Sequence, residues 1–105
     1  MSEIHRISLL VADYHEIEVG GPILSVAADR KGRSDVLDLW FENGDYPSRK
    51  VAVYMVGTGH PLPWSSRPTK HAYRFVGSVV TALGLVWHVY TSDYLRDQPI
   101  PEIRL

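Results

Sequence analysis

Residues 35–42 read DVLDLWFE, and this stretch decides the fold class. Its apolar positions recur at every second residue and are Leu37, Leu39 and Phe41. Asp38 and Trp40 fall between them and point to the opposite face, because successive side chains of a strand alternate between two faces. An amphipathic helix would instead repeat its apolar residues at three- and four-residue spacings. The stretch therefore predicts a β-strand with one face on a core.

Short runs of the same kind lie on both sides of this strand, separated by turn signals. They occupy residues 4–11, 16–19, 23–29, 51–56, 73–80 and 85–91. No helix-length segment shows apolar residues at a clean period of 3.6, and strands spaced by turns favour an all-β architecture. We therefore expect a single small sandwich or barrel of about six to seven mostly antiparallel strands.

Turn residues set the expected connections. Residues 30–33 form a polar hairpin turn between two strands, and residues 81–84 form another. Asn43-Gly44 is a dipeptide that favours two-residue hairpin turns, so a hairpin is expected there as well. Residues 51–56 are apolar at every position, which indicates a central strand that is covered on both faces.

The length of 105 residues fits one domain. We assign residues 1–92 to a β-rich domain and residues 93–105 to an extended C-terminal tail. Pro99 and Pro101 lie in this tail, and proline cannot donate a hydrogen bond within a sheet. The tail is therefore not a central strand.

Composition excludes several classes of function. A net charge of -1, from 11 basic and 12 acidic side chains, argues against non-specific binding to nucleic acid or to an anionic membrane. The absence of cysteine excludes disulfides and thiolate nucleophiles. The longest apolar-biased run, residues 75–90, is shorter than the roughly 20 residues of a membrane helix. The N-terminus does not have the pattern of a secretory signal, so we expect an intracellular protein.

The segment GTGHPLPW, residues 57–64, is the most unusual local run. Glycine amides can form an anion-binding nest, and a histidine can donate to a phosphate. A phosphate-binding loop, however, carries lysine and serine or threonine and opens a helix, and neither feature is present. The simpler interpretation is a proline-stiffened turn. An anion site would use Gly57, Gly59, His60, Arg67 and Lys70.

No catalytic or metal-binding motif stands out. The five histidines lack the spacing of a metal-ligand motif, and no serine elbow or carboxylate pair occurs. We therefore expect no cofactor, no metal and no catalytic residue. A hydrolase that uses His60 is the weaker alternative.

Aromatic residues on polar faces or in loops often mark interfaces. Trp40 lies on the polar face of its strand, Tyr90 lies beside a histidine on its strand, and Trp64 lies in a loop. We expect these three side chains to contact a protein partner. The alternative is that a second sheet covers them.

Three motifs together carry a family resemblance: VGTGHPLP at residues 56–63, FVGSV at 75–79 and GLVWHVY at 84–90. The chain resembles a family of small uncharacterised proteins that is common in tailed-bacteriophage genomes. The resemblance implies a phage or prophage origin and an accessory role, and it carries over no catalytic residue. We therefore expect a non-catalytic protein in the host cytoplasm that binds a host or phage protein, as a homo-oligomer. The alternative is a binder, or sponge, of a small anionic ligand such as a nucleotide signal.

Overall fold

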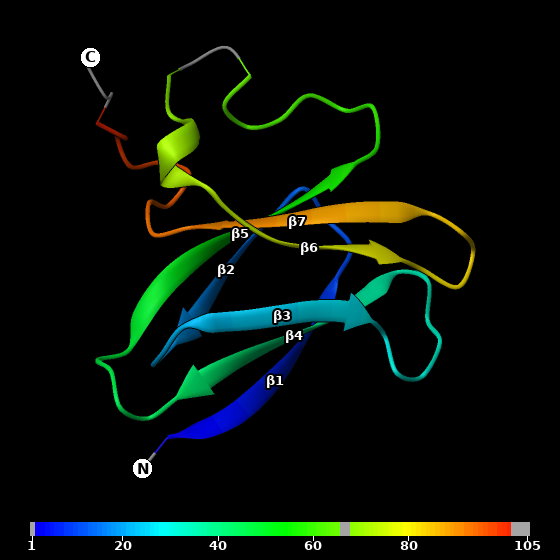
Figure 1. Ribbon diagram of the computed structural model, residues 1–105, viewed down its shortest axis with the longest axis horizontal. Helices are drawn as coiled ribbons and strands as arrows, with labels where there is room; N and C mark the ends of the chain where they lie inside the picture. Colours follow the sequence, from blue (N-terminus) through cyan, green and yellow to red (C-terminus); the bar gives the residue numbers. More distant parts are fainter. Residues whose placement is uncertain (1, 66–67, 102–105) are drawn as a thin grey trace.

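Seven strands in two antiparallel sheets make up the fold, as expected from the sequence (Figure 1). The computed structural model describes residues 2–65 and 68–101. Those residues contain no α-helix and one turn of 3-10 helix. The elements are β1 (Glu3–Leu10), β2 (Tyr14–Val19), β3 (Ile23–Ala28), β4 (Val36–Asn43), β5 (Arg49–Gly57), η1 (Lys70–Ala72), β6 (Arg74–Val80) and β7 (Val86–Ser92).

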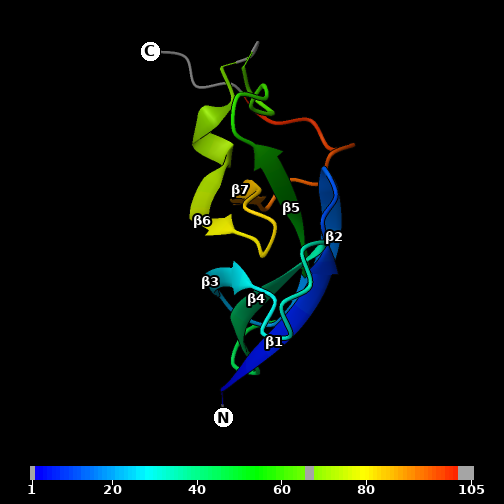
Figure 2. The same cartoon turned by 90° about the vertical axis from the view of Figure 1, so that its right-hand side faces the viewer.

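The two sheets have the strand orders β1-β4-β3 and β2-β5-β7-β6. The chain passes from the first sheet to the second in the short bend between β1 and β2. There the Val11 N–H donates to the Asp35 carbonyl at 2.7 Å, and the Met55 N–H donates to the Asp13 carbonyl at 3.3 Å. On the other side β3 lies next to β6 (Figure 2). The result is a flattened sandwich, with principal extents of 45 × 40 × 21 Å.

Gly77 permits the close approach of β6 to β3. A Cβ at this position would lie 3.1 Å from Cγ1 of Val26, which is tighter than ordinary van der Waals contact. The register of β6 against β7 also shifts between Phe75 and Gly77. A glycine within a strand often marks such a bulge or a close backbone approach.

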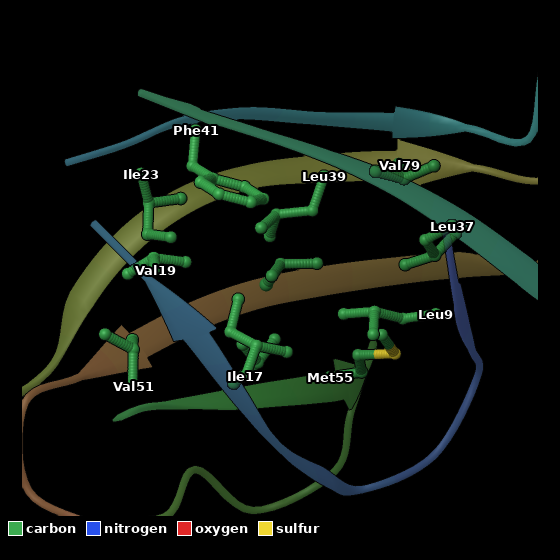
Figure 3. Close-up of a cluster of buried hydrophobic side chains, with 12 residues drawn as sticks. Leu9, Ile17, Val19, Ile23, Leu37, Leu39, Phe41, Val51, Met55 and Val79 are labelled. Atoms are coloured by element: carbon green, nitrogen blue, oxygen red, sulfur yellow. The ribbon is translucent and has the colours of Figure 1, made fainter. Parts of the chain in front are cut away.

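One hydrophobic core fills the space between the sheets (Figure 3). The alternating apolar positions of residues 35–42 point into it, so the strand pattern that decides the fold class is confirmed. The buried cluster consists of Leu9, Ile17, Val19, Ile23, Leu37, Leu39, Phe41, Val51, Val53, Met55, Val79 and Val89.

Strand β5 is buried on both faces, which confirms the expected central strand. Val51, Val53 and Met55 belong to the core, whereas Tyr54 and Val56 lie on the opposite face and are also buried, each 9% exposed. Other side chains therefore also cover this outer face of the second sheet.

The hairpin expected at residues 30–33 is present and joins β3 to β4. Asp29 holds it: its carboxylate accepts hydrogen bonds from the Arg33 backbone N–H and side-chain Nε, both at 3.0 Å. These bonds lower the pKa of Asp29 to about 2, chiefly through the Arg33 side chain. Gly32 has a φ of 78° within this turn.

Val36 and Asp38 lie on the face of β4 opposite to the predicted core face, and both are buried. Asp38 is the polar residue of the two. It is fully buried, and its carboxylate accepts hydrogen bonds from Ser8 Oγ at 2.7 Å and from the Arg30 N–H at 3.2 Å. Burial alone would raise the pKa of Asp38. The two hydrogen bonds and the Arg6 guanidinium, 3.5 Å away, outweigh it and hold the pKa below its ordinary value.

The hairpin expected at Asn43-Gly44 is wrong. Strand β4 pairs with β1 and β3, whereas β5 pairs with β2 and β7, so the turn carries the chain from one sheet to the other. The Asn43 side chain accepts a hydrogen bond from the Gly20 N–H at 2.8 Å. A tertiary contact therefore determines the path of the chain at a dipeptide that would otherwise favour a hairpin.

Candidate binding site

A row of aromatic side chains crosses the outer face of the second sheet. Tyr14 of β2 pairs with Tyr54 of β5, Tyr54 pairs with Tyr90 of β7, and Tyr90 pairs with Phe75 of β6. Because paired residues share a face, the four rings lie in line across all four strands. Ring centroids are 5.1 Å apart for Tyr14 and Tyr54 and 5.3 Å apart for Phe75 and Tyr90.

Two more rings lie on this row. Trp64 comes from the loop after β5, and Tyr73 follows η1. The Trp64 ring is 4.8 Å from Tyr73 and 5.0 Å from Tyr90, and Tyr73 is 5.4 Å from Tyr54. Aromatic pairs of this kind contribute about 0.5–1.5 kcal/mol each beyond the area they bury. They attach the loop to the outer face of the sheet.

The loop begins with a tight turn, and its residues up to 65 then run across the upper part of the molecule (Figure 1). The His60 N–H donates to the Gly57 carbonyl at 3.0 Å, and Gly59 has a φ of 87°. A positive φ at the third position of a turn is the conformation that favours glycine. Gly59 therefore serves the turn, as the simpler interpretation predicted, whereas Gly57 ends β5 and accepts the hydrogen bond that closes the turn.

An open pocket of about 560 Å³ lies between the loop and the aromatic row. This volume is within the range of roughly 300–1,000 Å³ that is typical of ligand sites. Phe75, at the β6 end of the row, is 54% exposed. The pocket is lined by Leu62, Trp64, Lys70, His71, Tyr73, Phe75 and Tyr90.

The opposite end of the row is closed by the C-terminal segment. The Arg96 N–H donates to the Tyr14 hydroxyl at 2.9 Å, and the Arg96 guanidinium lies 4.3 Å from the centre of the Tyr14 ring. Tyr14 in turn donates to the Glu16 carboxylate at 2.9 Å. Burial raises the pKa of Tyr14, and it also raises the pKa of Tyr54. Both phenols are therefore neutral at physiological pH.

The structure brings only some of the expected site residues together. Trp64, Tyr90 and Lys70 line the same pocket. Trp40 lies on the other sheet, where it pairs with Arg6 and Ser25, so any contact it makes with a partner belongs to a different surface.

The expected anion site is likewise divided. Gly57, Gly59 and His60 form the turn and do not line the pocket. The His60 ring lies back against Gly57, where a Cβ would be 3.3 Å from Nδ1. Arg67 lies outside the residues that the structure describes. Of the four members of this set that the structure describes, Lys70 alone lines the pocket.

Four pocket residues were not among the site residues expected from the sequence: Leu62, His71, Tyr73 and Phe75. The signal was present, because Tyr73 and Phe75 share the period of a strand with Tyr90 on the next one. Their place beside Tyr90 follows from the pairing of Phe75 with Tyr90 between two strands, and the sequence of one strand alone does not reveal its pairing register.

His88 joins the start of the loop to β6. Its Nε2 is 2.8 Å from the Thr58 hydroxyl, and its Nδ1 is 2.7 Å from the Ser78 hydroxyl. In neutral histidine one ring nitrogen donates and the other accepts, so one hydroxyl accepts and the other donates. The described hydrogen bonds give this group no carboxylate partner, so it does not form a serine-type triad.

Within residues 2–65 and 68–101, no group of three or more histidine, aspartate or glutamate side chains is arranged to hold a metal ion. No helix in that part of the chain is long and apolar enough to cross a membrane.

Comparison with protein families places the chain. A family model described as a domain of unknown function, DUF7352, matches residues 1–99. The chain belongs to this family. The DUF7352 match includes the whole two-sheet fold, the pocket and Arg96 of the C-terminal segment. Comparison with the curated proteins and with the solved structures finds no match.

Proposed function

We propose that this DUF7352 protein is a phage-encoded accessory protein that works in the host cytoplasm by binding a host or phage protein at its aromatic pocket, without catalysis. The observation that carries the proposal is the meeting of Trp64 and Tyr90, from a loop and a distant strand, in one open pocket. Tryptophan and tyrosine are enriched among the residues that contribute most to protein–protein binding.

The exposure of the pocket supports a protein partner. Phe75 leaves 54% of its surface open to solvent, and the neighbouring rings are only partly buried. A partner side chain that enters the pocket would cover these rings. The tight turn at residues 57–60 and the His88 hydrogen bonds hold the loop in place beforehand, which reduces the entropy lost on binding.

A small anionic ligand is the second candidate. Lys70 and His71 line the pocket beside the rings, so a planar anion such as a nucleotide would find both a stacking surface and positive charge. This site differs from the expected one, because it uses Lys70 and His71 and does not use the glycines of the turn.

Self-association is part of the proposal and uses a different surface. Trp40 lies on the outer face of the first sheet, and Ile4 on the neighbouring strand is 67% exposed. Light scattering of the wild type and of Trp40→Ala would test it. A wild-type oligomer that dissociates in the variant supports the proposal, whereas a wild-type monomer at micromolar concentration contradicts it.

Site-directed photo-crosslinking tests the binding function. A photoreactive phenylalanine analogue replaces Phe75, and the same analogue replaces Leu83 as the control. Leu83 is 76% exposed in the turn between β6 and β7 and does not line the pocket. We expect one partner protein to be labelled from position 75 and not from position 83 in a host lysate. Equal labelling from both positions, or none from position 75, would contradict the proposal.

A further inference from the structure

A second, smaller pocket of about 220 Å³ adjoins the aromatic one. His71 and Tyr73 line both pockets and form the wall between them. The second pocket is polar, and its lining includes Arg49, Arg74 and Asp93.

Basic groups are distributed along both pockets. Lys70 lines the aromatic pocket, and Arg74 lines the polar one. Among the residues that the structure describes, no acidic side chain lines the aromatic pocket. Asp93 lines the polar pocket and is the one acid to do so within residues 2–65 and 68–101. Its carboxylate lies 3.5 Å from Nε of Arg49. Since the whole chain has a net charge of -1, this positive surface is a local feature.

We infer that the two pockets together receive an acidic segment of a partner protein, with one aromatic side chain of that segment in the larger pocket. This inference rests on the proposed binding function and specifies the partner's chemistry. The aromatic side chain would contact Trp64, Phe75 and Tyr90. Flanking aspartate or glutamate side chains would reach Lys70 on one side of the wall and Arg74 on the other.

The distribution of charge favours a peptide over a nucleotide. An extended chain advances about 3.3 Å per residue, so it can present carboxylates on both sides of its anchor. A mononucleotide carries its charge at one end and would leave either Lys70 or Arg74 without a counter-charge. The aromatic pocket is also open, whereas small-ligand sites commonly bury most of the ligand.

The rings and the charges play different parts in the binding. A buried aromatic anchor supplies most of the affinity, and charges at the edge of an interface mainly raise the association rate and the selectivity. The affinity is therefore expected to fall at high salt, because ions screen exposed charges.

Backbone-amide NMR titrations of the full chain test the inference with synthetic peptides. The probes are Glu-Glu-Trp-Glu-Glu, its charge-reversed partner Lys-Lys-Trp-Lys-Lys, its anchor-free partner Glu-Glu-Ala-Glu-Glu, and ATP. We expect the first peptide to shift the amides of the pocket residues and to bind about tenfold or more tightly than either of the other two peptides.

Matched variants locate the contacts. Phe75→Ala removes an exposed ring and is expected to lower the affinity for the acidic tryptophan peptide about tenfold or more. Lys70→Glu and Arg74→Glu are each expected to lower this affinity about threefold or more, because exposed ion pairs contribute only modest energy. Lys31→Glu changes the net charge equally in the exposed turn between β3 and β4 and is expected to have little effect.

Each contrary outcome has a distinct meaning. Equal affinity for the glutamate and lysine peptides overturns the acidic partner and leaves the aromatic pocket as a protein site. Equal affinity for the alanine peptide overturns the aromatic anchor. Pocket shifts with ATP alone overturn both the inference and the proposed protein-binding function. Shifts with none of the probes overturn the inference, while the crosslinking experiment separately decides the proposed function.

Discussion

Trp64 and Tyr90 meet with their ring centroids 5.0 Å apart and their planes at 78°. One ring belongs to a loop and the other to a paired strand, so this edge-to-face contact joins the most irregular part of the chain to its most regular part. Tyr73 contacts Trp64 as well, at 4.8 Å. The loop therefore depends on these rings for its position.

Replacement of Trp64 by alanine should loosen the loop. The variant loses contacts with two rings, and we expect the free energy of unfolding to fall by about 1–3 kcal/mol. Amide hydrogen exchange at residues 58–65 should rise more than exchange in β5. Trp64→Phe keeps a ring and should lose less stability. Unchanged exchange in Trp64→Ala would show that the rings do not hold the loop.

Gly21 should not tolerate a side chain. A Cβ there would lie 2.3 Å from the Glu42 carbonyl oxygen, a backbone atom that cannot move aside cheaply. We expect Gly21→Ala to lower the free energy of unfolding by about 2 kcal/mol or more, measured by denaturant titration. Gly32→Ala is the control: its φ is 78° with no atom within 4 Å, so it should cost only about 1–2 kcal/mol.

Acid should destabilise the hairpin between β3 and β4. The pKa of Asp29 is lowered from 3.8 to about 2, chiefly by the Arg33 side chain. A lowered pKa means that the folded state binds the proton more weakly than the unfolded state does. The contribution of Asp29 to stability is therefore complete above about pH 4 and is lost as the pH falls toward 2.

The variant Asp29→Asn isolates this effect, because it has no titrating group at position 29. The free energy of unfolding of the wild type should fall more steeply than that of the variant between pH 4 and pH 2. A variant slope equal to that of the wild type would contradict the role of Asp29.

The hydrogen bonds from His88 to the hydroxyl groups of Thr58 and Ser78 should hold the start of the loop in place. Thr58→Val keeps the shape of the side chain and removes the hydrogen bond to Nε2, which is 2.8 Å long. We expect a loss of about 0.5–1.5 kcal/mol in the free energy of unfolding. The imidazole nitrogen shifts of His88 should change as well, and Ser78→Ala should affect Nδ1 instead. Identical nitrogen shifts in wild type and Thr58→Val would rule out the bond.

The strands could be predicted from the sequence because their signal is local. The alternation in residues 35–42 and the apolar run at residues 51–56 each specify a strand and its buried faces. The first two residues of β2, Tyr14 and His15, were not predicted as part of the strand, because they do not continue an apolar pattern.

The pocket was harder to predict because it depends on pairing between strands. Trp64 and Tyr90 were expected to be exposed contacts, and nothing in the run of residues placed them together. The turn at Asn43 shows the same limit, since its path depends on the Gly20 amide, which is distant in sequence. Asp38 looked like a surface residue until Ser8 and the hairpin backbone were placed around it.

The bend between β1 and β2 has a consequence for the nascent chain. Residues 3–19 supply one strand to each sheet, and their partners are β4 and β5. When they leave the ribosome, β1 has no partner until the chain has been made as far as residue 43, and β2 has none until it has been made as far as residue 57. Completion of the second sheet waits further, until β7 has been made as far as residue 92. Leu9 of β1 and Ile17 of β2 therefore wait for strands made later before they can be buried in the core, and in that interval they add to the exposed apolar surface through which unfinished chains aggregate.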